Sequence, residues 1–269
     1  MEEPEKLIAG LKVMLKLFPN AKGTLVVEDN KPDCIEKLKE LIKLSNNIVF
    51  FGGAGVSTES NIPDFRSEKG LYNQNKYQYR AEEILSRTFY NLHKEEFYHF
   101  YINEMIYPKA KPNQAHLALT KLEKQGKLKA IITQNIDGLH QEAGSKNVIE
   151  LHGSVKRNHC LKCNTFYNEL ELIKYYGICP KCHNYIKPDV VLYEEMLKEN
   201  DINDAILYIS NCDTLIVGGT SLSVYPAASF IKFFKGENLV LINNEKTTYD
   251  QYATLIIRNK IGKVLSQVI

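Results

Sequence analysis

The chain has 269 residues, 44% hydrophobic and 25% charged, a composition typical of a globular protein with one large domain or a domain with a smaller insert. The formal net charge of +2 is too small to indicate a nucleic acid or an anionic membrane as a partner. No apolar run is long enough to span a bilayer, and the acidic start Met1–Glu5 lacks a signal-peptide pattern, so we expect a cytoplasmic protein. The oligomeric state stays open.

Residues 1–32 form an N-terminal extension to which the sequence assigns no role. After a predicted helix, the apolar residues 48–51 are few enough for one buried strand, and a glycine-rich turn at 52–55 follows. Such a turn presents bare backbone N–H groups to a phosphate. It does not read G-x-G-x-x-G, so an ordinary dehydrogenase fingerprint is a poor match. The run 63–66 (Pro-Asp-Phe-Arg) adds a carboxylate, an aromatic face and a guanidinium, which together can hold a dinucleotide and act on it.

The rest of the chain alternates between helical and strand patterns. Residues 67–108 have helical apolar spacing and predict a small helical lobe. Five apolar segments then predict buried strands or strand ends, at 129–133, 148–151, 189–193, 214–221 and 239–244. Polar residues gather where these strands end, which is the ligand-binding edge of an open parallel sheet. The sequence therefore predicts an α/β fold with a Rossmann-like parallel sheet.

Four of the six cysteines form two close pairs, Cys160-x-x-Cys163 and Cys179-x-x-Cys182, with fifteen residues between the pairs. This spacing fits a tetrahedral zinc site made of four thiolates. A closed shell leaves no position for water, so we expect one structural zinc in a module at 159–186. The basic residues of this module are scattered among acidic ones, which favours a structural insert over a nucleic-acid-binding module.

Three further polar segments follow predicted strands: Gln134–Asp137, His152 and Gly219–Ser221. Each has an ordinary explanation when taken alone, because a histidine after a strand is more often a satisfied core or surface residue and Asn-x-Asp is often only a turn. Their joint occurrence in this order, with the cysteine module directly after His152, indicates one shared site.

Together these motifs resemble the sirtuin family, the NAD-dependent protein lysine deacylases. The motifs that carry the resemblance are Gly53-Ala54-Gly55-Val56-Ser57-Thr58, Ile62-Pro63-Asp64-Phe65-Arg66, Thr133-Gln134-Asn135-Ile136-Asp137, His152-Gly153, the four cysteines, Lys187-Pro188-Asp189-Val190-Val191 and Gly219-Thr220-Ser221-Leu222. The likeness spans roughly residues 33–265.

The resemblance implies a Rossmann-like large domain with a small domain made of a helical and a zinc-binding module. The implied large domain comprises residues 33–66, 109–158 and 187–269, and the small one comprises 67–108 and 159–186. NAD and an acylated lysine of a protein substrate would lie in the cleft between the two domains.

The resemblance also implies how the residues act when the nicotinamide–ribose bond is broken. His152 would be the general base on a ribose hydroxyl, and Asn135 would hold ordered water and ribose hydroxyls. Asp137 and the Ile136 backbone would bind the carboxamide, while Phe65 would cover the reacting face of the sugar. The products would be nicotinamide, free lysine and O-acyl-ADP-ribose. The expected cofactor-binding residues are Gly53, Ala54, Gly55, Ser57, Thr58, Asp64, Phe65, Arg66, Gln134, Asn135, Ile136, Asp137, His152, Gly219, Thr220, Ser221, Asn243, Glu245 and Ile261.

The acylated peptide is expected beside residues 190–195, where it would add a strand across the cleft. The expected substrate-binding residues are Phe65, Tyr98, Val190, Val191, Tyr193 and Glu195. Desuccinylating family members carry a Tyr-x-x-Arg pair in the helical lobe, and Tyr98 and Tyr101 stand at those places here, so the cation is missing. Burying a carboxylate without a cation costs several kcal/mol. We therefore expect neutral acyl groups, acetyl or longer.

Three positions depart from the family pattern. Asn61 stands where most members have glycine, and asparagine tolerates the left-handed backbone conformation. Gly52 replaces the usual threonine before the glycine turn. Glu194 replaces the glycine of the usual Phe-Gly-Glu, which predicts a somewhat different fit of the peptide strand.

Two other functions are compatible with the same residues. An NAD-dependent protein ADP-ribosyltransferase on the same fold would send the ribosyl group to a protein side chain. A non-enzymatic zinc-ribbon binding module would have no affinity for NAD and would be indifferent to His152→Ala.

Overall fold

A computed structural model describes residues 32–67, 70–73 and 76–269. The expected N-terminal extension, apart from residue 32, lies outside the described residues. Within these ranges, no helix has both the length and the apolar character that a membrane crossing requires. The cytoplasmic location stays a prediction.

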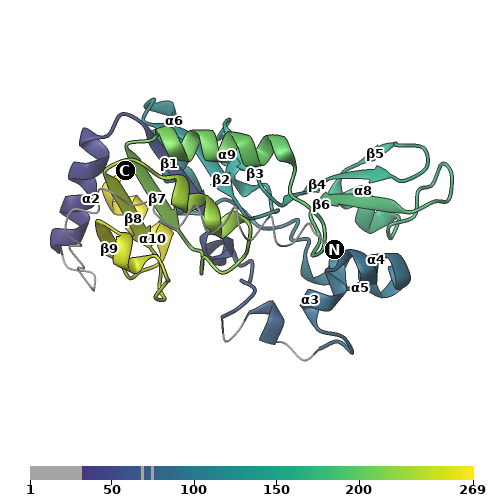
Figure 1. Cartoon of the computed structure of the whole chain (residues 1–269). Helices are drawn as coiled ribbons and strands as arrows, with labels where there is room; N and C mark the ends of the chain where they lie inside the picture. The colour runs from purple at the N-terminus through teal and green to yellow at the C-terminus, as the bar shows by residue number, and fades with distance from the viewer. Residues whose placement is uncertain (1–31, 68–69, 74–75) are drawn as a thin grey trace, which may run out of the picture.

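Six parallel strands form the larger of two sheets, in the order β3-β2-β1-β7-β8-β9 (Figure 1). The strands are β1 (Ile48–Gly52), β2 (Leu128–Thr133), β3 (Val148–Glu150), β7 (Thr214–Gly218), β8 (Asn238–Ile242) and β9 (Leu255–Ile257). The strand order reverses between β1 and β7, because β2 and β3 extend to one side and β8 and β9 to the other. The turns after β1 and β7 therefore leave the same edge side by side, where open α/β sheets bind ligands.

Helices cover both faces of this sheet, and the strand sequence shows why. In β1, Val49 and Phe51 belong to one hydrophobic core and Ile48 and Phe50 to another, and all four side chains are 0% exposed. Successive side chains of a strand point to opposite faces, so a strand that is apolar throughout must be covered on both. The first core includes α9 (Glu199–Asn211) and η5 (Ala227–Phe233); the second includes α2 (Pro32–Leu44), α6 (Gln114–Lys124) and α10 (Ile261–Val268).

The second sheet is antiparallel and belongs to a small region at the other end of the molecule (Figure 1). Its order is β5-β4-β6, with β4 (Gly153–Cys160), β5 (Phe166–Tyr167) and β6 (Ile186–Val190). The helices of the same region are α3 (Ala81–Ile84), α4 (Arg87–Leu92), α5 (Lys94–Glu104) and α8 (Glu169–Lys174). Phe97 and Phe100 of α5 share one buried core with Leu172 of α8 and Ile186 of β6. The helical lobe and the cysteine module therefore pack as one unit.

One strand prediction differs from the structure, and one strand of the parallel sheet was not predicted. The segment 189–193 was expected to return the chain to the parallel sheet, but its first residues end β6, which pairs antiparallel with β4. An apolar segment shows that a strand is buried without showing which strand it pairs with. The edge strand β9 was missed, since its three residues Leu255–Ile257 are too few to give a pattern.

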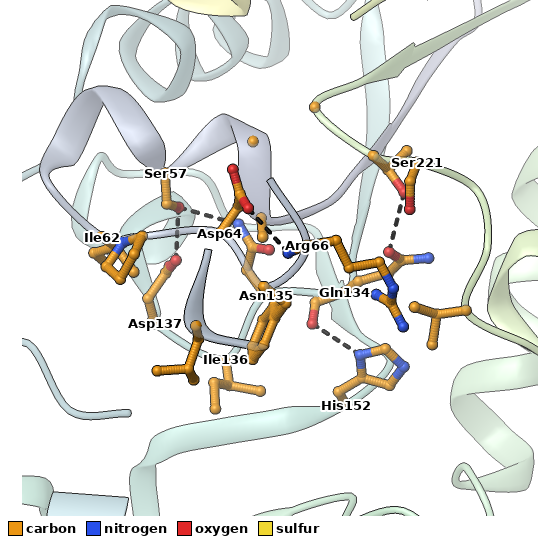
Figure 2. A pocket seen from close by; sticks show the side chains of 18 of the residues that line it. Ser57, Ile62, Asp64, Arg66, Gln134, Asn135, Ile136, Asp137, His152 and Ser221 are labelled. Carbon is orange, nitrogen blue, oxygen red and sulfur yellow. Dashed lines mark hydrogen bonds between the residues drawn. The ribbon is translucent and has the colours of Figure 1, made fainter. Parts of the chain in front are cut away.

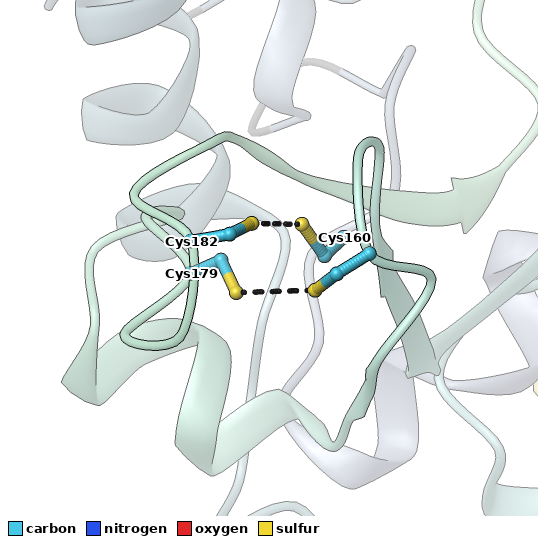
Figure 3. Close-up of side chains that lie close together, drawn as sticks. Cys160, Cys179 and Cys182 are labelled. Atoms are coloured by element: carbon cyan, nitrogen blue, oxygen red, sulfur yellow. Dashed lines mark hydrogen bonds between the residues drawn. The ribbon is translucent and has the colours of Figure 1, made fainter.

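The four cysteines of the module meet at one point (Figure 3). The Sγ atoms of Cys160 and Cys182 are 3.3 Å apart, those of Cys163 and Cys179 are 3.6 Å apart, and all four lie within 4.8 Å of one another. Ligand sulfurs about 2.3 Å from a tetrahedral zinc lie about 3.8 Å from each other, so this set fits Zn²⁺. The Tyr167 hydroxyl lies 3.1 Å from Cys179 Sγ and supplies the outer hydrogen bond that such ligands use.

Replacing Cys179 with serine should abolish stoichiometric zinc binding and lower the Tm, because the metal contributes folding free energy to a small ribbon. Metal analysis of the purified protein and a thermal melt measure both effects. Cys212→Ala is the control, since Cys212 is buried in the core beside α9 and is not part of the cluster. It should lose packing stability and keep the metal. An unchanged zinc content after Cys179→Ser would contradict the assignment.

Candidate active site at the carboxyl edge of the parallel sheet

A cavity of 590 Å³ opens at the carboxyl edge of the parallel sheet (Figure 2). This volume is within the range of small-molecule sites in proteins. Its wall combines the turns after β1, β2 and β7 with residues of α5 and of the segment 190–195, which begins at the last residue of β6. Both regions of the molecule therefore contribute to it.

The turn after β1 is held against the turn after β7 by backbone contacts. The N–H of Gly53 donates to the Gly218 carbonyl (3.2 Å), and the N–H of Gly55 donates to the Gly219 carbonyl (2.8 Å). A Cβ at Gly55 would lie 2.7 Å from the Cα of Gly219, so no side chain fits there. The short helices η2 (Ala54–Val56) and η3 (Thr58–Ser60) follow at once. The cavity wall thus keeps bare backbone where a pyrophosphate is expected.

Asn61 ends η3 with φ +62° and ψ +27°, which is the left-handed conformation predicted for this position. The tolerance of asparagine for this region is confirmed, and the departure from glycine leaves the turn intact.

A hydrogen-bonded chain joins the turn after β1 to the turn after β2 (Figure 2). The Asn135 amide donates to Ser57 Oγ (3.0 Å), and Ser57 Oγ donates to a carboxylate oxygen of Asp137 (2.6 Å). The other carboxylate oxygen accepts from the backbone N–H of Leu139 (2.9 Å). Burial raises the pKa of Asp137, while the bonds from Ser57 and Leu139 oppose that rise. The chain fixes a buried carboxyl group in a wall where a ligand amide could donate to it.

His152 lies in the turn between β3 and β4, and its Nδ1 is 2.9 Å from the Gln134 carbonyl (Figure 2). A carbonyl oxygen only accepts, so Nδ1 carries the hydrogen and Nε2 keeps its lone pair. Burial lowers the pKa of His152, and the bond to the Gln134 carbonyl partly offsets this. The imidazole is therefore neutral at pH 7 and can act as a base through Nε2.

Gln134 also connects the turn after β2 to the turn after β7. Its side-chain oxygen accepts from Thr220 Oγ1 (3.2 Å), whereas its Nε2 is buried with no hydrogen-bond partner among the described residues. Asn243, after β8, donates to the carbonyls of Thr220 and Glu245 (3.2 Å each). A buried N–H donor without a partner in a cavity wall fits a ligand hydroxyl such as that of a ribose.

The structure brings together nearly all of the predicted cofactor-binding residues, since every one except Gly53 lines the cavity. Gly53 instead helps to hold the turn in place, because its N–H donates to the Gly218 carbonyl. The Asp64 carboxylate accepts from the backbone N–H groups of Arg66 (3.0 Å) and Ser67 (2.8 Å), so it shapes its own loop. The individual contacts of these residues with a cofactor stay predictions.

Five of the six predicted substrate-binding residues line the cavity, and Tyr98 is the exception. Tyr98 is buried in the core of the small region, its hydroxyl donates to the Ile186 carbonyl (2.7 Å), and its ring stacks on Tyr185. Tyr98 therefore lies outside the cavity wall, because this face of α5 packs on the cysteine module, and its role in substrate binding stays a prediction. Tyr101, one helical turn later, stands in the cavity wall.

Glu194 shows how the segment after β6 tolerates its departure from glycine. Its φ is +71°, and its carboxylate accepts from the N–H (2.9 Å) and the hydroxyl (2.7 Å) of Thr88 on α4. The neighbouring Tyr193 bonds through its own N–H and carbonyl to Leu85 and Arg87. One edge of this segment is therefore occupied by the small region, and β-augmentation by a peptide stays a prediction for the other edge.

Motif reasoning missed Tyr72, which also lines the cavity. Its hydroxyl is 2.6 Å from the hydroxyl of Tyr193, and its ring centre is 5.3 Å from that of Phe65. Through these two contacts, Tyr72 connects the loop that carries Phe65 to the segment expected to hold the peptide. No spacing in the sequence indicates a contact between residues so far apart.

The chain is similar to curated and solved proteins along most of its length. An NAD-dependent protein deacetylase of Clostridium perfringens is 60% identical over 241 residues, which is 88% of this chain and 99% of that protein. One of Staphylococcus aureus is 42% identical over 236 residues, covering 87% and 97%. A solved structure of Sir2 with a p53 peptide and NAD⁺ superposes with a TM-score of 0.76 at 40% identity, covering 87% and 96%.

A second Sir2 structure, with a deacetylated p53 peptide and 3'-O-acetyl ADP-ribose, has a TM-score of 0.80 at 38% identity and covers 87% and 96%. The sequence model of the Sir2 family matches residues 53–226, from the glycine turn through the cysteine module to the loop after β7. The resemblance drawn from the motifs is confirmed: this chain belongs to the Sir2 family.

Proposed function

We propose that this chain is an NAD-dependent protein lysine deacetylase that transfers the acyl group to ADP-ribose and releases nicotinamide. The observation that carries the proposal is that one cavity wall holds the neutral His152, the Asn135–Ser57–Asp137 chain and Phe65. Relatives that are 42–60% identical are named NAD-dependent protein deacetylases. Sir2 structures similar to this one contain NAD⁺ and a peptide, or an acetyl ADP-ribose.

The residues present fit NAD at two places. The turn after β1 offers backbone N–H groups with no side chain in the way, and Gln134 Nε2 is a buried donor without a partner among the described residues. When bound, NAD supplies a ribosyl carbon that can exchange its bond to nicotinamide for a bond to the acyl oxygen. The Asp137 carboxylate would accept a hydrogen bond from the carboxamide N–H, and Phe65 would keep water from the reacting face.

His152 moves the proton in this scheme. Its Nε2 would take a proton from a ribose hydroxyl, whose oxygen would bond to the acyl carbon while the bond from that carbon to the lysine nitrogen breaks and free lysine leaves. The Gln134 carbonyl holds the ring by Nδ1, so that the lone pair of Nε2 stays available. A positioned base of this kind contributes about 10²–10⁴-fold to the rate.

The deciding assay measures NAD-dependent nicotinamide release from an acetyl-lysine peptide and identifies the acyl product. Free O-acetyl-ADP-ribose supports the proposal. Label from NAD on protein, without that product, would indicate an ADP-ribosyltransferase instead. A lack of NAD affinity would indicate a non-enzymatic binding module.

His152→Ala should lower kcat by about 10²–10⁴-fold, since it removes the base. His99→Ala is the matched control, because His99 is exposed on α5 and does not line the cavity. In the unsubstituted enzyme, the rate should fall with acid only below pH 6.5, because burial lowers the pKa of His152 and protonation of Nε2 stops catalysis. An acid limb centred above pH 6.5, or full activity of the His152 variant, would rule out this role.

Ser57→Ala should break the Asn135–Ser57–Asp137 chain and leave a buried carboxyl group without its hydroxyl donor. Loss of such a bond costs about 1–3 kcal/mol, so kcat/KM for NAD should fall by about 5- to 100-fold. Ser266→Ala, an exposed serine on α10, should leave it unchanged. Equal NAD kinetics in the two variants would show that the chain does not support the site.

An acetyl-lysine peptide should be preferred over its succinyl counterpart by about 100-fold in kcat/KM, because a buried carboxylate without a cation costs several kcal/mol. The described residues between 70 and 107 contribute Glu104 to the wall and neither lysine nor arginine. Steady-state kinetics on the two peptides measure the ratio. A preference for succinyl would refute the expectation.

A further inference from the structure

The pairing of β4 with β6 is interrupted by a bulge that places Arg157 between the two sheets. Residues 155–157 have no partner in this ladder, although the residues on either side of them do. A bulge of this kind redirects the side chains that it carries. The Arg157 guanidinium is bonded to two carboxylates: Nη1 donates to Glu150 (2.6 Å) and Nε donates to Asp189 (2.9 Å). Glu150 ends β3 of the parallel sheet and Asp189 belongs to β6, so Arg157 joins the two sheets.

The segment enclosed by these contacts is the turn that carries His152. Glu150 is on the strand before this turn and Arg157 is on the strand after it, so the ion pair between them closes the turn. The His152 carbonyl also accepts from the N–H of Val191, in the segment expected to hold the peptide (2.9 Å). The imidazole itself is held through Nδ1 by the Gln134 carbonyl. The direction of Nε2 therefore depends on where the turn lies.

The two ion pairs are sufficiently buried to hold the turn in place. The side chain of Glu150 is 8% exposed, that of Asp189 27% and that of Arg157 40%. Burial alone would raise the pKa of Asp189, but hydrogen bonds from Arg157 and Lys198 lower it below its usual value. A buried carboxylate that loses its cation is costly. Without Arg157, Glu150 would therefore move toward water, and the turn would move with it.

Arg157 does not contact the reacting groups, because neither it nor its two carboxylate partners line the cavity. We propose that Arg157 is a positioning residue for the general base: it holds the turn so that His152 Nε2 meets the ribose hydroxyl that receives the acyl group. This inference rests on the proposed deacylase function. Placement of this kind affects rate strongly, since a displacement of about 1 Å can cost about 100-fold.

The experiment separates the step that needs His152 from the step that does not. In the proposed scheme, exchange of labelled nicotinamide into NAD in the presence of an acetyl-lysine peptide uses no base, whereas formation of O-acetyl-ADP-ribose requires His152. Arg157→Met should lower kcat for O-acetyl-ADP-ribose by about 10- to 100-fold, while the exchange rate at saturating peptide and the Kd for NAD change by less than about threefold.

Lys127→Met is the control for a lost cation that only supports the fold. Its Nζ donates to the carbonyls of Ile42, Lys43 and Ser45 (2.8–2.9 Å). It lies just before β2, at the edge of the parallel sheet opposite the cavity, and does not line the cavity. This variant should have a lower Tm, with exchange and O-acetyl-ADP-ribose formation both unchanged.

Two further variants test the route through which Arg157 acts. Because Arg157 acts through Glu150, adding Glu150→Gln to Arg157→Met should slow O-acetyl-ADP-ribose formation no further. Arg157→Lys keeps the charge but lacks the planar fork that reaches two carboxylates, so it should recover only part of the lost kcat. It also replaces Arg157→Met in the comparison if that variant does not fold.

Each outcome decides the matter. Unchanged O-acetyl-ADP-ribose formation in a folded Arg157 variant, or a loss shared equally by nicotinamide exchange, would overturn the role of Arg157. A further loss in the double variant would contradict the route through Glu150. If the unsubstituted protein forms O-acetyl-ADP-ribose and the Arg157 variants do so equally well, the inference fails and the proposed function stands. If the unsubstituted protein forms none, the proposed function itself fails.

Discussion

The contact between two backbone turns, one after β1 and one after β7, sets the geometry of the whole site. Gly55 approaches Gly219 so closely that neither position has room for a Cβ, and the N–H of Gly55 is bonded across the gap. This approach is possible because β1 and β7 are neighbours in a parallel sheet whose strand order reverses between them. The strands are apolar on both faces, so a core on each face holds them in register. The positions of the two turns are fixed by the strands that they follow.

Gln134 links the strand ends on which the chemistry depends. Its carbonyl sets the tautomer of His152 after β3, and its side chain is bonded to Thr220 after β7. Asn135, the next residue, begins the chain through Ser57 to Asp137. Catalytic and binding groups from separate strands are therefore positioned by one short turn after β2.

The sequence was sufficient wherever a local pattern has one physical meaning. A short apolar run followed by glycines predicted β1 and its turn, and the cysteine spacing predicted the sulfur cluster. It failed where the answer depends on packing between distant segments. The face of α5 that carries Tyr98 is decided by the cysteine module, and the Tyr72–Tyr193 pair joins residues that no spacing relates.

The strand β6 connects the cysteine cluster to the cavity wall. Its first residue, Ile186, pairs with Cys160 of the sulfur cluster, and its last, Val190, lies in the cavity wall. The turns after β1, β2, β7 and β8 of the parallel sheet form much of the rest of the wall. We therefore expect that loss of the metal would weaken binding of the acylated peptide before it weakened binding of the dinucleotide.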